Sequence, residues 1–376
     1  RGRRVLVLER EPLGFGASTR NGGMEIPELH ASPAELRHRY GPLGDAMWAS
    51  VNEAFDWVED LIERDGLDCA YERTGMLLVA HAPHAAESLR RLAGELRAEG
   101  EEADVVEGAA LAAEVGSAVH ETGVLVARTG GLQPARFHAG LARLALGAGA
   151  EVHDRTAVVT VDRRPGQGWR VYTNRARVEC RQLLLAANAT IDGTFGDLRR
   201  RVVPIGSYIV ATEPLEPALA AEISPRGRML VDTKNFLFYW RLSPDGRVVF
   251  GGRKSLLPPS PEAARDHLAA GLARIHPQLD GVRLTHSWGG YVAVTVDRLP
   301  HCGVRDDLWY ATGCNGSGVA TMPWLGAQVA AAMTGDGPLP PFAELDHRPV
   351  PLWRLRRLTL PVAGAWFGAQ DRGWVR

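Results

Sequence analysis

The segment from Val5 to Met24 constrains the fold of this chain more than any other. It begins with Val5-Leu6-Val7-Leu8, a short apolar run that is typical of a parallel strand covered on both faces. The run ends at Glu9, and in a dinucleotide-binding βαβ unit an acid at the end of the second strand accepts hydrogen bonds from ribose hydroxyls. The segment therefore predicts a strand and loop that bind a dinucleotide, although a buried strand followed by an ordinary glycine-rich loop has the same pattern.

The loop after this strand, from Gly14 to Gly23, has small residues that can cradle a pyrophosphate and two adjacent glycines where a planar ring can approach the backbone. It resembles the second-strand region of the D-amino-acid-oxidase-like family of FAD-dependent oxidoreductases, in which G-x-S-x-x-N/S-G-G is frequent. It is most similar to the branch that includes the γ-glutamylputrescine oxidases. The resemblance implies that FAD contacts Glu9, Arg10, Ser18, Thr19, Arg20, Asn21, Gly22 and Gly23.

Two later blocks resemble the same family and follow in the family's order. The first opens with Gly130-Gly131 and Pro134, before an expected helix, and ends in the apolar run from Leu183 to Ala189. An ordinary α/β unit with a buried strand has the same pattern. The resemblance implies that the backbone of Val158 meets adenine and that Ala187, with Asn188, lies near the cofactor.

The second block contains W-x-G at Trp288, T-x-D-x-x-P from Thr295 to Pro300, and G-x-x-G-x-G from Gly313 to Gly318. We expect a helix from about Val319, and the positive end of its dipole can stabilise negative charge on a reduced flavin. The resemblance implies cofactor contacts from Gly313, Asn315, Gly316, Ser317, Gly318 and Val319. Together the three blocks are far more specific than any one alone.

The family fingerprint G-x-G-x-x-G is expected on the strand-to-helix turn that precedes Val5, roughly 30 residues upstream in a βαβ unit. The sequence begins at Arg1, where the intervening helix would end. We therefore expect an N-terminally truncated sequence that lacks the first βα unit of the domain.

These patterns predict an α/β fold with α+β elements, in which a Rossmann-like FAD-binding domain of the glutathione-reductase type is interleaved with a mainly antiparallel substrate sheet. We assign 1–40, 130–200 and 300–337 to the FAD-binding domain, 41–129 to a helical and substrate-domain segment, 201–299 to the substrate domain, and 338–376 to a C-terminal tail of loops. Locally, Ser32-Pro33-Ala34-Glu35 predicts a helix start, and Asp245-Gly246 predicts the turn of a hairpin between strands at 236–241 and 248–253.

The candidate catalytic residues come from this substrate sheet. Tyr239 and Tyr291, with Trp240 and Tyr208, are candidate aromatic walls of a pocket, and Arg241 or Arg253 could bind a substrate carboxylate. Each has an alternative reading, because sheet aromatics often pack in a core and arginines often pair with acids. We find no Ser-His-Asp order, metal-ligand cluster or catalytic carboxylate pair, which fits an enzyme whose cofactor carries the difficult step.

Two departures from the family pattern bear on the substrate and the electron acceptor. Amino-acid-oxidising relatives often have W-x-G-x-R, with the arginine on the substrate α-carboxylate, whereas this chain has Val292 there. Sarcosine-oxidase-like relatives have a lysine near the flavin, where this chain has Val249, with Lys254 close in sequence. The resemblance thus implies oxidation of a C–N bond of an amine or amino acid, such as a γ-glutamyl polyamine, by hydride transfer to flavin N5 and hydrolysis of the imine. Oxygen or another acceptor takes the electrons.

FAD is expected to bind noncovalently, because no His or Cys lies between Arg20 and Met24. The net charge of -1 does not indicate nucleic-acid binding, and the four cysteines lack metal-site or disulfide spacing. We expect a reduced, cytoplasmic setting and no transmembrane segment, since no apolar run reaches roughly 18 residues. Two alternatives stay open: oxidation of a 2-hydroxy acid, and a non-catalytic truncated or structural subunit.

Overall fold

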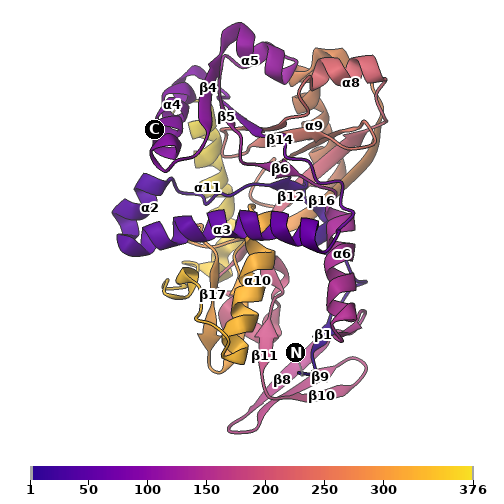
Figure 1. The fold of residues 1–376 in the computed structure, drawn as a ribbon, viewed down its shortest axis with the longest axis vertical. Helices are drawn as coiled ribbons and strands as arrows, with labels where there is room; N and C mark the ends of the chain where they lie inside the picture. The colour runs from indigo at the N-terminus through magenta and orange to yellow at the C-terminus, as the bar shows by residue number, and fades with distance from the viewer. Residues whose placement is uncertain (1–2, 375–376) are drawn as a thin grey trace.

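The computed structural model of the protein describes residues 3–374. The largest sheet has eight strands. In Figure 1 this sheet and its helices lie in the upper part and several smaller sheets in the lower part, with the long helix α3 (Pro42–Arg64) across the middle. Each region is built from segments that are far apart in sequence. This arrangement confirms the predicted mixed architecture.

The lower region contains most of the parallel pairing. β1 pairs in parallel with β7, and β11 pairs in parallel with β18, which is antiparallel to β17. β8, β9 and β10 form an antiparallel meander. The strands are β1 (Leu6–Leu8), β7 (Glu151–His153), β8 (Val158–Arg164), β9 (Gly168–Thr173), β10 (Arg177–Cys180), β11 (Leu183–Leu185), β17 (His301–Arg305) and β18 (Leu308–Thr312), and the helices are α1 (Ala17–Arg20), α6 (Pro134–Gly147), α7 (Gly196–Arg199) and α10 (Gly318–Thr334).

The upper sheet has the strand order β16-β12-β15-β14-β13-β3-β5-β4. Every neighbouring pair is antiparallel except β13 with β3, as predicted for the substrate sheet. The strands are β3 (Met76–Val79), β4 (Ala103–Glu107), β5 (Thr122–Val126), β12 (Val203–Thr212), β13 (Met229–Asp232), β14 (Phe238–Leu242), β15 (Val248–Gly252) and β16 (Leu284–Val294). The helices beside them are α4 (Pro83–Ala98), α5 (Gly108–Val115), α8 (Pro217–Ile223) and α9 (Pro261–Ile275).

Side-chain alternation on β14 positions the site. Phe238 and Trp240 belong to the largest hydrophobic core, where they pack with Phe250 of β15 and Leu268 of α9. Because successive side chains of a strand point to opposite faces, Tyr239 lies on the face turned away from this core. Trp240, which we expected as a pocket wall, is only 1% exposed and is a core residue.

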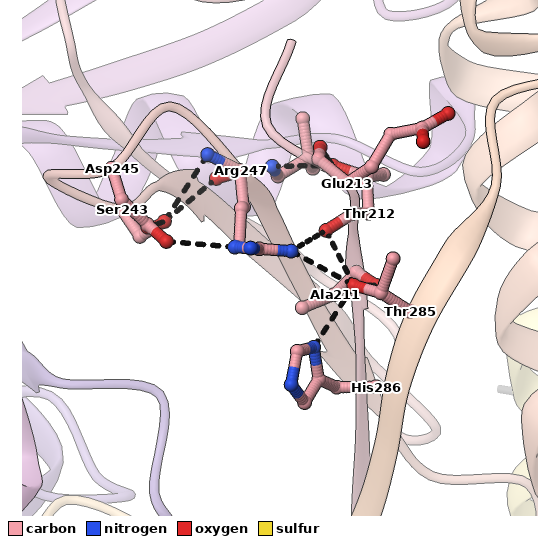
Figure 2. Close-up of polar contacts among 9 residues, drawn as sticks. Ala211, Thr212, Glu213, Ser243, Asp245, Arg247, Thr285 and His286 are labelled. Carbon is pink, nitrogen blue, oxygen red and sulfur yellow. Dashed lines mark hydrogen bonds and ion pairs between the residues drawn. The ribbon is translucent and has the colours of Figure 1, made fainter.

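The predicted hairpin is present, with β14 antiparallel to β15 and Gly246 at φ +78° in its turn. Figure 2 shows how the turn is attached to the sheet: Arg247 donates from Nε to Asp245 (2.7 Å) and from Nη1 to the Thr212 carbonyl and to Thr285 Oγ1 (2.9 Å each). Thr212 is in β12 and Thr285 is in β16, so one side chain joins the hairpin turn to two other strands.

Several local predictions are also confirmed. The Ser32 hydroxyl accepts from Glu35 N (3.2 Å) at the start of α2 (Pro33–Tyr40). The sequence also predicts a helix from Gly44 to Arg64, because apolar residues from Met47 to Leu61 recur at three- and four-residue steps, and α3 covers this range. The apolar stripe of α3, which includes Met47, Val51, Phe55 and Val58, is fully buried.

The prediction that the C-terminal tail consists of loops is wrong. Short 3-10 turns at Pro341–Ala343 and Trp353–Leu355 lead into α11 (Arg356–Asp371), a 16-residue helix. The proline-rich approach to this segment suggested loops, but the one proline within the helix, Pro361, is accommodated. Tertiary contacts stabilise the helix at its end, where the Asp371 carboxylate accepts from Asn235 N (2.7 Å) and Phe236 N (3.1 Å).

Candidate active site

A cavity with about 880 Å³ of empty space, counting its opening to solvent, lies between the loop after β1, one face of the upper sheet and the start of α10. It is the meeting point of the segments that the sequence singled out. Its lining residues are Ala17, Arg20, Asn21, Gly22, Met24, Ile26, Glu28, His30, Ser207, Val231, Leu237, Tyr239, Arg253, Gly290, Tyr291, Val292, Asn315, Gly316, Ser317 and Val319.

Hydrogen bonds to the backbone fix the loop that carries Arg20 and Asn21. Arg20 Nη1 donates to the Gly289 carbonyl and Trp288 Nε1 donates to the Arg20 carbonyl, both at 3.0 Å, so the loop is joined to β16. Asn21 Oδ1 accepts from Gly23 N (2.8 Å), and Asn21 Nδ2 donates to the Ala17 carbonyl (3.0 Å). These bonds hold the loop against the sheet and leave its next residue, Gly22, facing the cavity.

Gly22 and Gly23 are required by close packing. A β-carbon on Gly22 would lie 2.8 Å from Tyr239 Cε2. On Gly23, which has φ +68°, a β-carbon would lie 2.0 Å from the Leu132 carbonyl oxygen. Tyr239 therefore packs directly on the loop, and its hydroxyl lies 3.3 Å from Ser207 Oγ. Burial raises the pKa of the Tyr239 phenol.

The structure gives Arg241 a different place from the one we expected. Its guanidinium does not line the cavity; Nε donates to the Gly22 carbonyl (2.7 Å) and Nη2 to the Leu132 carbonyl (2.6 Å). The residue is 8% exposed, and burial lowers its pKa to about 10. Arg241 thus binds the backbone of the loop rather than offering its charge to a substrate.

Arg253, in contrast, lines the cavity. Within residues 3–374 no hydrogen bond or ion pair to another residue is found for its guanidinium, and burial lowers its pKa. A β-carbon on Gly316 would lie 3.4 Å from Arg253 Nη2 and 3.8 Å from His30 Nε2, so both side chains converge on the turn before α10. Arg253 is a cation available to an anionic group in the cavity.

The sequence reasoning missed the segment after β2 (Met24–Glu25), which pairs with β6 (Gly130–Gly131). Alternate residues of this extended segment line the cavity: Met24, Ile26, Glu28 and His30. Ser317 Oγ donates to Glu28 Oε1 (2.6 Å), and His30 Nε2 donates to the Asn315 carbonyl (2.7 Å). The two-residue alternation after Gly23 was the signal that could have identified them.

Two asparagines shape the turn before α10. Asn188 Oδ1 accepts from Gly313 N (3.1 Å), while Asn315 accepts from Thr295 N (3.0 Å) and donates to the Gly313 carbonyl (2.6 Å). Both asparagines have positive φ, a conformation that asparagine tolerates better than most residues. The turn presents Gly316 and Ser317 to the cavity at the positive end of the α10 dipole.

The structure divides the sequence-predicted site residues into two groups. Those that line the cavity are Arg20, Asn21, Gly22, Tyr239, Arg253, Tyr291, Asn315, Gly316, Ser317 and Val319. Those that lie elsewhere are Glu9, Arg10, Ser18, Thr19, Gly23, Val158, Ala187, Arg241, Gly313 and Gly318.

The residues of the second group near β1 and β7 are outside this cavity but close to its loop. Glu9 Oε1 accepts from Glu11 N (2.8 Å), Thr19 donates to the Gly14 carbonyl, and Ser18 is exposed. Val158 begins β8, and Ala187 precedes the Asn188 turn. Val292, which replaces the arginine of the W-x-G-x-R pattern, lines the cavity. Lys254 is exposed and donates to the Ala263 carbonyl.

A buried acid lies behind the cavity wall. Glu25, between the lining residues Met24 and Ile26, is fully buried, and neither carboxylate oxygen has a hydrogen-bond partner among the described residues. Burial raises its pKa to about 8. The neighbouring Tyr71 hydroxyl donates to Glu59 Oε1 (2.6 Å).

Replacing Glu25 by glutamine should stabilise the protein in a pH-dependent manner. Between the unfolded pKa and the folded pKa of about 8, unfolding releases the proton of Glu25, so wild-type stability falls as pH rises. Glutamine does not titrate, so the stability of the variant does not fall in this way. At pH 7 its free energy of unfolding should exceed that of the wild type by about 3 kcal/mol, and near pH 4.5 the two should differ little. Urea unfolding at several pH values measures the difference, with Glu63→Gln, at an exposed glutamate of α3, as the control. A constant difference across pH would contradict the prediction.

No group of three or more His, Cys, Asp or Glu side chains suited to a metal ion is found in residues 3–374. Across the same residues, no helix is both long enough and apolar enough to span a membrane.

Comparison with known proteins agrees with the geometry. A family model described as FAD dependent oxidoreductase (DAO) matches residues 1–332. The chain belongs to this family. Membership confirms the resemblance carried by the three sequence blocks, and it makes the chain an FAD-dependent oxidoreductase.

Other members of the family resemble the chain over most of its length. Gamma-glutamylputrescine oxidoreductase of Escherichia coli (strain K12) is 28% identical over 374 residues, which cover 98% of this chain and 87% of that protein. Among solved structures, glycine oxidase from Geobacillus kaustophilus has a TM-score of 0.78 at 20% identity over 92% of each chain. L-proline dehydrogenase from P. horikoshii has a TM-score of 0.75 at 18% identity over 95% of this chain and 92% of that one. The two solved structures share the fold of this chain.

Proposed function

We propose that this chain oxidises a carbon–nitrogen bond of an amine or amino acid with noncovalently bound FAD. The observation that carries the proposal is the cavity, where loop residues 20–22 and 315–317 meet Tyr239, Arg253 and Tyr291 of the sheet. The relatives named above support the substrate class, because each is named for an amine or an amino acid. We also propose that the chain is divided into an FAD-binding domain and a substrate domain at the boundaries predicted from the sequence.

The lining residues fit a flavin ring. Gly22, Gly290 and Gly316 present backbone without side chains, and a β-carbon on Gly22 would collide with Tyr239. Asn21 and the turn at Asn315 to Ser317 would hold the ring, and the positive end of the α10 dipole would stabilise negative charge on it. The lining includes no cysteine, and its one histidine, His30, is bonded to the Asn315 carbonyl, which supports noncovalent binding.

When bound, FAD supplies the acceptor for a hydride from the carbon that bears nitrogen, and water then hydrolyses the resulting imine. This chain's own residues bind and orient the amine and exclude water. Tyr239 and Tyr291 provide aromatic walls, and Val292 makes the adjacent wall apolar. Arg241 acts as a positioning residue through its bonds to the Gly22 and Leu132 carbonyls.

The charges in the cavity favour a substrate with both an amino group and a remote carboxylate. Arg253 has no partner among the described residues and can bind a carboxylate, while Glu28 offers a carboxylate to an ammonium group. Both lie near the turn at Gly316 and Ser317. A γ-glutamyl polyamine has this combination of groups, which places its carboxylate far from the reacting carbon.

Replacing Arg253 by methionine should separate two kinds of substrate. We expect kcat/KM to fall about 10- to 100-fold for amines that carry a remote carboxylate, because a charge-assisted hydrogen bond is lost. It should stay within about twofold for amines of the same length without a carboxylate. Arg253→Lys should recover part of the loss. An equal loss for both kinds of amine would remove Arg253 from carboxylate binding.

The oxidation itself is tested by anaerobic bleaching of the flavin absorbance with panels of amines, amino acids and 2-hydroxy acids. Bleaching by amines or amino acids alone supports the proposal. Bleaching by 2-hydroxy acids alone would replace it with the alternative substrate class, and no bleaching by any panel would favour a non-catalytic protein. Hydrogen peroxide formation in air then shows whether oxygen accepts the electrons.

A further inference from the structure

Several exposed apolar residues lie on the C-terminal helix α11 and the turn before it. On α11 and the turn before it, Leu355, Leu358, Val362 and Trp366 are 49%, 70%, 72% and 51% exposed, respectively. Their spacing of three and four residues places them on one face of the helix. No residue of α11 is buried, so this apolar face has no partner within residues 3–374. We define these four residues as the α11 stripe.

The helix that carries the stripe is held to the protein at both ends. Near its start, Trp353 Nε1 donates to the Val202 carbonyl (3.3 Å), and the Arg199 guanidinium lies 5.0 Å from the Trp353 ring centroid. Near its end, Asp371 accepts from Asn235 N and Phe236 N. Figure 1 shows α11, in yellow, running beside the upper sheet toward α4. The stripe is therefore displayed on an anchored helix, not on a loose tail.

The exposed charges that flank the stripe on α11 and its end turns are of one sign. Arg354 and Arg372 are exposed at its two ends, whereas Arg357, seven residues before Gly364, lies on the opposite face of the helix. The only acid from 349 to 374 is Asp371, and its carboxylate is bonded to the backbone at Asn235 and Phe236. The whole chain has a net charge of -1, so this is a local concentration of positive charge. Leucine, valine and tryptophan on one helix face with arginine beside them are typical of helices that lie in the interface of an anionic bilayer.

We propose that α11 is a peripheral docking surface for an anionic lipid bilayer. The α11 stripe enters the boundary between headgroups and acyl chains, with Trp366 at the headgroup level, while the exposed Arg354 and Arg372 contact lipid phosphates. A second copy of the chain fits this face less well, because a two-fold interface would bring the same arginines together without an exposed acid of 349–374 to pair with them.

The docking surface lies close to the cavity. β-carbons on Gly364 and Gly368 would lie 3.7 and 4.0 Å from Phe236, and the next residue, Leu237, lines the cavity. Phe367, on the inward side of α11, contacts the Arg298 guanidinium at 5.7 Å from the ring centroid. A docked molecule would thus hold this wall of the cavity near the bilayer.

Sedimentation with vesicles tests the proposal on the full chain. We expect binding to vesicles of equal parts phosphatidylcholine and phosphatidylglycerol to be about 25-fold tighter than to phosphatidylcholine alone, because two arginines near the surface each add about fivefold. High salt should remove most of this difference. Equal or undetectable binding to both kinds of vesicle would overturn the proposal without any variant.

The variant Leu358→Glu/Val362→Glu should lose binding to anionic vesicles, whereas Leu146→Glu, at a leucine of α6 that is 51% exposed, should bind as the wild type does. Thermal unfolding verifies that both variants fold. A wild-type dimer that dissociates in the double variant, without vesicle binding, would identify a second copy as the occupant and reject the bilayer. Equal loss of binding in Leu146→Glu would also reject it.

Discussion

Gly23→Ala should lower the free energy of unfolding by about 4 kcal/mol and remove bound flavin from the purified protein. Two effects add at this position. The backbone has φ +68°, which is unfavourable for alanine, and the new β-carbon would lie 2.0 Å from the Leu132 carbonyl oxygen and 2.5 Å from Arg241 Nη2. The loop would have to move away from both, and Asn21 and Gly22 would move with it.

Gly66→Ala is the matched control for this prediction. Gly66 has a similar φ of +59°, but a β-carbon there would meet nothing within 4 Å. It should therefore cost only about 1 kcal/mol, the cost of the backbone conformation without the collision. Urea unfolding measures both variants, and the visible spectrum reports the flavin. If the two variants differed by less than about 1 kcal/mol, the close approach of Gly23 to Leu132 would be refuted.

Arg241→Met should also lower the free energy of unfolding by about 4 kcal/mol, because it leaves the carbonyls of Gly22 and Leu132 without their buried donor. Methionine fills much of the same volume, so the loss is mainly of hydrogen bonding. Arg247→Met, in the turn that follows β14, is the control. Arg247 also bonds to a carbonyl, that of Thr212, but its side chain is 24% exposed and its ion pair with Asp245 lies at the surface (Figure 2). It should cost about 1 kcal/mol.

The readouts distinguish positioning by Arg241 from direct binding of substrate. If Arg241 is a positioning residue, its replacement should lower stability and weaken flavin binding. It should change kcat and KM alike for amines with and without a carboxylate. A rise in KM confined to carboxylate substrates, at unchanged stability, would instead place the Arg241 guanidinium in contact with substrate. Arg241→Lys should recover little stability, because a single ammonium replaces the planar guanidinium poorly at two carbonyls.

Much of the fold could be predicted because local signals and tertiary structure agree. The Ser32 cap, the Asp245-Gly246 turn and the buried stripe of α3 each follow from short-range chemistry that the folded protein retains. α11 could not be predicted in this way, since its end depends on contacts between Asp371 and the backbone near Asn235, which is distant in sequence. Proline-rich sequence before the helix gave the opposite indication.

The candidate site was predictable as a set of segments, but less so as a set of side-chain roles. Tyr239, Trp240 and Arg241 are consecutive, and all three were candidates for the cavity. Strand alternation sends Trp240 to the core, and the backbone of the loop takes up Arg241, which leaves only Tyr239 in the lining. The sequence does not show that the Gly22 carbonyl lies beside Arg241, so it could not predict that Arg241 binds the loop backbone. Glu28 and His30 were missed because they follow the glycine motif without a motif of their own.

The parallel pairing of β3 with β13 in the upper sheet has a consequence for synthesis of the protein. One edge of β3 pairs with β5. The other edge pairs with β13, whose residues lie about 150 positions later in the chain and are therefore synthesised later. At a translation rate of about 5 to 20 residues per second, the apolar Met76-Leu77-Leu78-Val79 edge stays open for roughly 10 to 30 seconds. During that time it can pair with other strand edges, including those of neighbouring nascent chains. Yield of native protein should therefore depend on expression temperature and chaperone supply more than the stability of the finished fold would suggest.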